Sequence, residues 1–327
     1  MNKRRVIFLT IIVVFICFCS FSMMSFSSTY PKRAVTVIVP WGAGGGSDIV
    51  ARMLADGLKK IFNVPFVVEN KPGAAGEIGI VSVVNAKPDG YTIGVGINVP
   101  SSLTLLIQKP EGERTYKMED LTRIANLDTD PSIIMVHSDS PFDSLDDFIE
   151  YAKENPNELS IAHTGPGGDD HLAQVKFEIV AGIKLKGVTY EGAAGQLGDL
   201  AGRHVDAAAV NVSQVKSLMD AGQIKPLAVM SEERVSLLPE VPTFKELGLD
   251  VINDLTRGVA GPAGLSEEIV TTLVNAIEKV LTEDQEFIKR AENMGLLIRF
   301  IGPEKYEEFL QKEYKDLKEI WEKDPWL

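Results

Sequence analysis

Four glycine-rich segments lie between apolar and amphipathic stretches of this 327-residue chain. Glycine lets a ligand approach the backbone closely and allows positive φ angles. Where such a segment opens a helix, the unpaired N–H groups of the first turn and the positive end of the helix dipole attract an anion. The segments are residues 40–48, 69–76, 163–171 and 190–195. Four in one chain predict a site that binds a small anion through main-chain amides.

Ser47 and Asp48, at the end of the first segment, have different predicted roles. The Ser47 hydroxyl can donate a hydrogen bond, so Ser47 is the better candidate for contact with an anion. Asp48 is interpreted as a helix cap rather than a ligand contact, because a carboxylate beside an anion must point away or accept N–H bonds. The alternative for the whole segment is that its glycines only make a tight turn.

Motifs for nucleotide binding and hydrolysis are absent from the sequence. Residues 42–47 lack the third glycine of a dinucleotide fingerprint, and no Gly-Lys-Ser/Thr follows them. There is also no Gly-x-Ser-x-Gly nucleophile turn. His163 and His171 flank two aspartates, but their spacing matches no metal motif, so neither a metal nor another cofactor is expected. His171 is interpreted either as a neutral donor to a ligand or as a structural hydrogen-bonding group.

Three further residues are candidates for the same site. Arg257 could pair with a second carboxylate through two parallel hydrogen bonds, although most arginines are solvated or ion-paired. Trp41 could form a wall of the cleft or pack in the core. Asn98 follows a predicted strand, where its amide could reach a ligand or serve a turn.

Short apolar runs and amphipathic stretches alternate along the chain and must position these segments. The predicted strands are 35–39, 65–69, 91–95, 132–136, 159–162, 187–190, 206–210 and 226–229. The predicted helices between them are 48–62, 78–85, 145–153, 172–181, 196–201 and 214–220. Three more helices are expected near the C-terminus, one from Ser266, one from a capping box at 282–285, and one from Gly302 to about Lys323. Apolar strands between helices indicate parallel sheets that are covered on both faces.

The first 27 residues have the pattern of a secretory signal peptide. Three basic residues precede an apolar run over residues 6–18, and small residues precede a cleavage point after Ser27. A retained membrane anchor is the alternative, although the apolar run is shorter than the roughly 20 residues that span a bilayer. Cys17 and Cys19 both lie in this leader, so the mature chain contains no thiol for disulfides, metals or catalysis.

The charge of the chain limits its partners. The formal net charge is −13, and removal of the three basic residues of the leader makes it −16. Nucleic acid and anionic membrane surfaces are therefore not expected partners. A small anion is also repelled at long range, so local dipoles must supply its attraction.

The ordered set of these segments resembles the solute receptors of the tripartite tricarboxylate transporter family, the Bug-type extracytoplasmic binding proteins. The resemblance covers essentially the whole mature chain. The residues that carry it are 30–31, 39–48, 68–76, 86–92, 164–172, 190–192, 238–244 and 261–264.

The resemblance implies a two-lobed α/β fold of the type II periplasmic-binding-protein class, in which each lobe is a mostly parallel sheet flanked by helices. Lobe 1 would contain residues 28–130 and 231–327, and lobe 2 would contain residues 131–230. Such receptors close on their ligand by hinge motion. The resemblance also implies an extracytoplasmic monomer without catalytic activity, which captures a small di- or tricarboxylate or a related organic acid for the permease subunits of the transporter.

The family motif also implies which residues contact the ligand, mostly through backbone groups and ordered waters. These residues are Gly44, Gly45, Ser47, Gly73, Ala74, Gly76, Thr164, Gly167, His171, Tyr190 and Gly192. This chain departs from the family where Glu191 replaces a common lysine, and where Ala193 and Ala194 replace a Gln or Pro. The missing lysine makes a highly charged ligand such as citrate a less secure assignment.

Two other functions are compatible with parts of the pattern. A sensor of the same fold would deliver its ligand to a histidine kinase, and the sequence does not separate that role from transport. An exported enzyme could use His171 and Asp170 as acid–base groups, but the sequence supplies no evident nucleophile or metal site.

Overall fold

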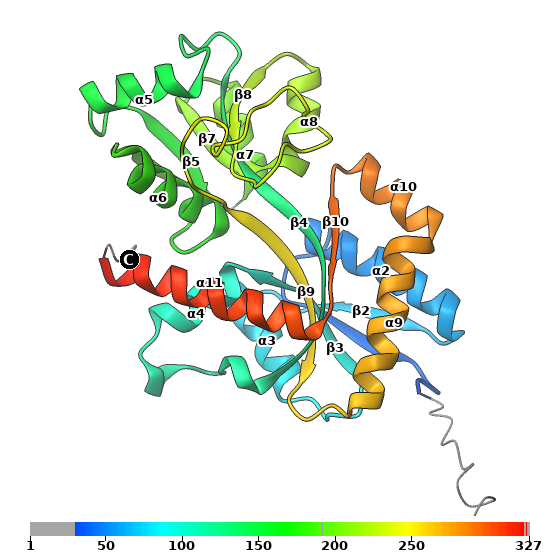
Figure 1. Ribbon diagram of the computed structural model, residues 1–327. Helices are drawn as coiled ribbons and strands as arrows, with labels where there is room; N and C mark the ends of the chain where they lie inside the picture. The colour runs from blue at the N-terminus through cyan, green and yellow to red at the C-terminus, as the bar shows by residue number, and fades with distance from the viewer. Residues whose placement is uncertain (1–29, 191, 324, 326–327) are drawn as a thin grey trace, which may run out of the picture.

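The apolar runs near the N-terminus lie side by side as strands in the computed structural model, which describes residues 30–190, 192–323 and 325 (Figure 1). Strand β1 pairs in parallel with both β2 and β3, and helices α2 and α3 connect them. The predicted strands and helices of this region are confirmed, with β3 extending four residues further than expected. The bounds are β1 Val35–Val39, α2 Gly46–Phe62, β2 Phe66–Asn70, α3 Glu77–Val84 and β3 Thr92–Val99.

The middle of the chain forms a second set of β-loop-α units. Strand β5 pairs in parallel with β6 and β7. The predicted elements of this region are again confirmed, because each apolar run fills one strand of a sheet with both faces covered. The bounds are α5 Leu145–Glu154, β5 Ser160–Thr164, α6 Asp169–Ala181, β6 Lys186–Tyr190, α7 Ala193–Ala201, β7 Ala207–Asn211, α8 Val212–Asp220 and β8 Ile224–Val229.

Two long strands, β4 (Leu121–His137) and β9 (Asp254–Pro262), join the two halves of the structure (Figure 1). The first part of β4 pairs antiparallel with β9, and its second part pairs antiparallel with β7 and β8. Strand β9 also pairs antiparallel with β3, and β10 (Leu297–Ile301) with β4. The α/β fold is therefore built on a mixed sheet: parallel pairing holds for the β-loop-α units, and every pair made by β4, β9 or β10 is antiparallel.

The sequence analysis did not predict β9, β10 or the first half of β4. Their polar residues interrupt the apolar pattern, but several of these polar residues are buried, including Asn126, Asp128, Asp130 and Arg257. Helix α4 (Ser101–Gln108) and three short 3-10 turns, Ala74–Gly76, Glu111–Glu113 and Met118–Asp120, were not predicted either.

The helical C-terminal region has the bounds α9 Glu267–Glu283, α10 Gln285–Asn293 and α11 Pro303–Lys323. Ser266 caps α9 as expected, by accepting from the amide of Ile269. The capping box predicted at 282–285 is wrong: Thr282 lies inside α9 and donates to Glu278 O, whereas Asp284 caps α10. Within the described part of the chain, no helix combines the length and apolarity needed to cross a bilayer.

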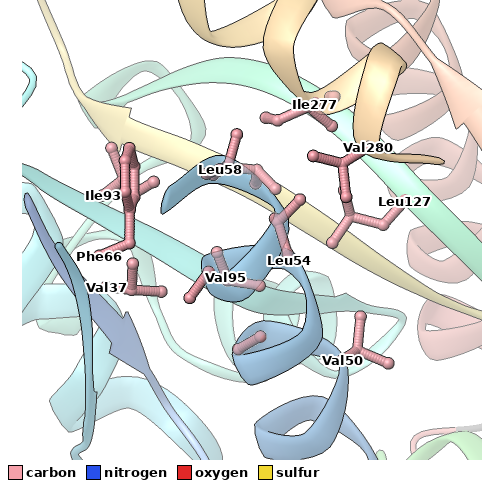
Figure 2. Close-up of a cluster of buried hydrophobic side chains, with 14 of the residues drawn as sticks. Val37, Val50, Leu54, Leu58, Phe66, Ile93, Val95, Leu127, Ile277 and Val280 are labelled. Carbon is pink, nitrogen blue, oxygen red and sulfur yellow. The ribbon is translucent and has the colours of Figure 1, made fainter. Parts of the chain in front are cut away.

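The buried side chains form separate cores in the two halves. Figure 2 shows the core between α2, α9 and the sheet, where Leu54, Leu58, Ile277 and Val280 pack together. The cores of the other half combine residues 133–230 with Val235, Leu238, Val241, Phe244 and Val251. The sequence-based boundary at residue 230 thus separates these five residues from the cores in which they pack.

The two halves touch on both sides of the crossing strands. On one side, Leu172 of α6 packs with Leu103 of α4 and Tyr306 of α11, and the Thr104 hydroxyl donates to Gly167 O at 2.9 Å. On the other side, Gly295 lies so close to Leu237 that a Cβ on the glycine would be 2.5 Å from it. These contacts leave a space between the halves rather than filling it.

Asp254, where β9 leaves the second half, makes stability depend on pH. Burial raises its pKa from the usual 3.8 to about 6, although Arg299 lies 3.6 Å away. Between these pH values the folded chain holds a proton that the unfolded chain has lost, so the free energy of unfolding falls as pH rises from about 4 to about 6. We expect Asp254→Asn to remove about 2–3 kcal/mol of this decline in urea titrations. The exposed Asp250→Asn should leave the profile unchanged, and an equal effect of both variants would contradict the assignment.

Candidate functional site

A cavity of about 730 Å³ lies between the two halves, at the carboxyl ends of several strands. Its wall includes residues of five helices, α2, α4, α6, α7 and α8, of which α4 lies along the cavity from Ser101 to Gln108. Each contributes residues from its first turn or from the loop before it. Because helix N-termini carry unpaired N–H groups and partial positive charge, the cavity is suited to an anionic group.

The first glycine segment supplies Gly45, Gly46 and Ser47 to the cavity wall. Gly45 is the N-cap of α2 and has extended backbone angles, φ −75° and ψ 167°. Its lack of a side chain leaves the approach to the first turn of α2 open, and the Arg257 guanidinium lies next to Gly46, where a Cβ would be 3.0 Å from a guanidinium nitrogen. The predicted contacts Gly45 and Ser47 are therefore placed at the cavity.

Gly44 is not at the cavity, because Asp48 uses its amide. The Asp48 carboxylate accepts from Gly44 N at 2.9 Å, from Arg52 Nε at 3.0 Å and from Asn70 Nδ2 at 2.9 Å. Burial alone would raise the pKa of Asp48, but these hydrogen bonds lower it. Asp48 thus holds the loop in shape and accepts N–H bonds, but its interpretation as the helix cap is wrong, because Gly45 is the N-cap and Asp48 lies in the first turn of α2.

The fourth segment supplies Gly192 and Ala193, at the N-terminus of α7. This helix has Gly192 as its N-cap and no acidic residue in its first turn, and no described side chain caps it. Tyr190 is not part of the cavity wall: its hydroxyl donates to Asp199 at 2.7 Å, and burial and Asp199 raise its pKa to about 12. Among the described residues, therefore, no side chain caps the amides at the start of α7.

The third glycine-rich segment also has some residues in the cavity wall and others outside it. Thr164 and Gly167 line the cavity, whereas His171 lies behind them. His171 Nδ1 accepts from Gly167 N at 3.3 Å, and its ring packs on His163 with centroids 4.7 Å apart. Burial and His163 lower the pKa of His171 to about 4, so it is neutral at pH 7. Its position fits the structural interpretation, and within the described ranges no three His, Cys, Asp or Glu side chains are grouped to hold a metal.

The second segment forms a wall more than a contact surface. Only Ala75 reaches the cavity from it, while Gly73, Ala74 and Gly76 do not. Gly76 has φ +96° and packs against Trp41, where a Cβ would be 3.3 Å from the indole. Trp41 lines the cavity and donates from Nε1 to Gly96 O at 2.6 Å. Both interpretations of Trp41 therefore hold.

Arg257 lies at the floor of the cavity and is 3% exposed. Its guanidinium donates to Asp128 at 2.7 Å and to Asp130 at 3.2 Å. Asp130 also accepts from the amide and hydroxyl of Ser213, at 3.0 and 2.6 Å, so the cluster connects β9 to the first turn of α8. Asn98 is opposite Arg257 in the pairing of β3 with β9, and its side chain lies outside the described part.

Several residues of the cavity wall were missed in the sequence. Pro100-Ser101-Ser102, directly after a strand, is a helix-start signal that could have revealed α4. The other missed residues come from segments far apart in the sequence, and no local pattern around them predicts that they line a cavity. The missed residues are Gly46, Ala75, Ser101, Thr104, Leu105, Gln108, Gly165, Pro166, Gly168, Asp169, Asp170, Ala193, Asn211, Ser213, Gln214, Leu255, Met294 and Leu296.

Comparison with known proteins gives one family. The family model of the tripartite tricarboxylate transporter family receptor, TctC, matches residues 50–324. Protein BugT of Bordetella pertussis is 30% identical over 286 residues, which is 86% of either chain.

Solved structures resemble the chain over most of its length. A TctC solute-binding protein from Polaromonas is 32% identical and covers 90% of this chain and 100% of its own, with a TM-score of 0.77. A Rhodopseudomonas palustris protein with adipate is 27% identical (90% and 97% covered, TM-score 0.76). MatC from the same organism, with bound malate, is 26% identical (89% and 99% covered, TM-score 0.75). The two-lobed fold of these solute-binding proteins confirms the predicted fold class.

Proposed function

The chain belongs to the tripartite tricarboxylate transporter receptor family, and on this premise we propose that it captures a small organic carboxylate in the cavity between its lobes for membrane permease subunits. The observation that carries the proposal is the pair of helix N-termini at this cavity, α2 at Gly45 and α7 at Gly192. A carboxylate between them would accept several N–H bonds in a partly dry site, which are stronger than the same bonds in water.

The ligand contacts divide into two groups in this proposal. Gly45, Ser47, Thr164, Gly167 and Gly192 would form the contact surface, since all line the cavity. The other residues implied by the family motif would shape the loops from behind: these are Gly44, Gly73, Ala74, Gly76, His171 and Tyr190. The adipate and malate bound to relatives support a carboxylate as the ligand class.

Binding would close the lobes around the crossing strands. The described chain passes between the halves near Pro131 in β4 and Asp254 in β9, where Ser132, Met230 and Asn253 exchange backbone hydrogen bonds of 2.8–2.9 Å. We therefore place the lobe boundary at these two points, which moves residues 231–253 into lobe 2. Contacts that already join the halves, such as Thr104 with Gly167, would stabilise the closed form.

An extracytoplasmic location follows from the family and from the predicted leader. A related structure is a periplasmic binding protein, BugD. The predicted signal peptide, residues 1–27, lies outside the described residues. The permease subunits would recognise the closed form, and the cavity would return its ligand chemically unchanged.

Native mass spectrometry of the purified mature protein, followed by calorimetry with mono-, di- and tricarboxylates, tests this function. We expect one carboxylate to bind with a stoichiometry of one and to be recovered intact after long incubation. Failure of all small carboxylates to bind, or their chemical conversion, would refute the proposal.

A further inference from the structure

The floor of the cavity holds more carboxylates than cations. Asp169 and Asp170 line it at the N-terminus of α6, and Asp128 and Asp130 lie directly behind Arg257. Arg257 is the one basic side chain among the described residues of the cavity wall, and both of its neighbours Asp128 and Asp130 already accept from it. Four carboxylates thus share one guanidinium.

Several polar atoms around this floor have no hydrogen-bond partner among the residues described. They include Asp169 Oδ2, Asp170 Oδ1 and Gln196 Oε1, all of which are acceptors if both aspartates are ionised. Asp170 is 2% exposed and Gln196 is fully buried, with Gln196 Nε2 donating to Asp170 Oδ2 at 2.8 Å. The Thr164 hydroxyl and Arg257 Nε at the same floor are also without a hydrogen-bond partner among the described residues. Because buried polar atoms are almost always paired, these acceptors and donors are available to a ligand.

The pKa values of Asp169 and Asp170 are both raised, as expected for carboxylates buried close to other carboxylates. Burial raises the pKa of Asp169 even though a hydrogen bond from Asn211 lowers it, and the field of Asp130 raises it by more than Arg257 lowers it. Burial and Asp169 raise the pKa of Asp170 well above its ordinary range. Asp170 is the more deeply buried of the two, whereas Asp169 is half-buried and lines the cavity, and the nearby Arg257 already donates to Asp128 and Asp130.

We propose that the ligand is a zwitterion with one carboxylate at the N-termini of α2 and α7 and one ammonium group at Asp169. This inference rests on the proposed carboxylate site and adds a second subsite of opposite charge. An ammonium group supplies three donors and one positive charge, which complement the unpaired acceptor atoms and the excess of carboxylates at this floor.

A ligand with two or three carboxylates fits this floor poorly. Its second carboxylate would approach Asp169 without a free cation, and like charges in a partly dry site repel strongly. The other described side chains of the wall are uncharged, some apolar and some polar: Leu105, Leu255, Met294 and Leu296, and Ser101, Thr104, Gln108, Asn211, Ser213 and Gln214. The body of the zwitterion is therefore expected to be uncharged.

Matched sets of ligands test the inference on the unmodified protein. For chains of four, five and six carbons, each set contains the plain acid, its 2-amino and ω-amino derivatives, and the dicarboxylate. Calorimetry at pH 7 should show an amino derivative binding at least about tenfold more tightly than the plain acid and the dicarboxylate of the same length. Tighter binding of a dicarboxylate or plain acid overturns the inference while leaving the carboxylate site in place. If no ligand of any set binds, both the carboxylate site and the ammonium subsite are contradicted.

The variant Asp169→Asn should abolish the preference for the amino derivative, lowering its affinity at least about tenfold, without weakening the plain acid. The matched control is Asp146→Asn, which likewise removes a carboxylate from the first turn of a helix, α5, but at an exposed position outside the cavity wall. Equal loss of affinity for all ligands in Asp169→Asn would assign this residue a structural role and contradict the ammonium subsite.

Discussion

Gly45→Val is expected to lower carboxylate affinity by about 100-fold, which corresponds to about 2.7 kcal/mol of binding free energy. Gly45 lines the cavity as the N-cap of α2, and its backbone angles suit valine. A Cβ at this position would be 3.4 Å from Gly42 O, so the side chain fits without a clash. Its branches would cover the amides of the first turn and separate the anion from them.

The protein should remain folded in this experiment. Valine is a poorer N-cap than glycine, so we expect a loss of about 1 kcal/mol in the free energy of unfolding. Calorimetry gives the affinity, and urea titration gives the stability. The control is Gly42→Val in the same loop, because a Cβ there meets nothing within 4 Å and Gly42 does not line the cavity. Unchanged affinity in Gly45→Val, or equal loss in Gly42→Val, would remove α2 from the site.

Arg257→Met should destabilise the protein by about 3–5 kcal/mol at pH 7. The substitution leaves Asp128 and Asp130, 3% and 1% exposed, without their shared guanidinium. Burial already raises the pKa of Asp128, and Arg257 is the cation that opposes this effect. Without Arg257 the pKa of Asp128 rises further. The deficit should therefore shrink as pH falls from 7 to 5 and Asp128 takes up a proton.

Urea titrations at pH 5 and pH 7 measure this effect, with two comparisons. Asp128→Asn combined with Arg257→Met should recover part of the lost stability, since the double variant no longer buries that charge. Arg290→Met should change stability by less than about 1 kcal/mol, because Arg290 is 43% exposed and lies 3.7 Å from Asp56. A similar, pH-independent loss in both single variants would show that lost packing, rather than unpaired charge, dominates.

The β-loop-α units were predictable from the sequence because their signals are local. An apolar run such as 35–39 becomes a buried strand, and the glycine segment after it opens a helix whatever the rest of the chain does. The crossing strands were not predictable in this way. Polar residues such as Asp128 and Arg257 look like surface positions in the sequence, and they are buried only because β4 and β9 pair and place them together.

The candidate site was partly predictable because its glycine-rich segments are local signals in the sequence. Gly45, Ser47, Thr164, Gly167 and Gly192 are at the cavity as expected. Tyr190 and His171 belong to the same segments but turn to partners within their own lobe, Asp199 and Gly167. A family motif marks the loop, but side-chain packing decides which of its residues face the cavity.

The sequence by itself determined that several helices begin with bare glycine amides after buried strands, because both features depend on neighbouring residues. Only the tertiary structure decided which of those amides stay open: Asp48 takes the amide of Gly44, whereas the first turn of α7 has no acidic residue to compete for its N–H groups. The tertiary structure also brought Asp128, Asp130 and Asp169 around Arg257. Charges so far apart in the sequence interact only when strand pairing removes them from water and places them within a few ångströms of one another.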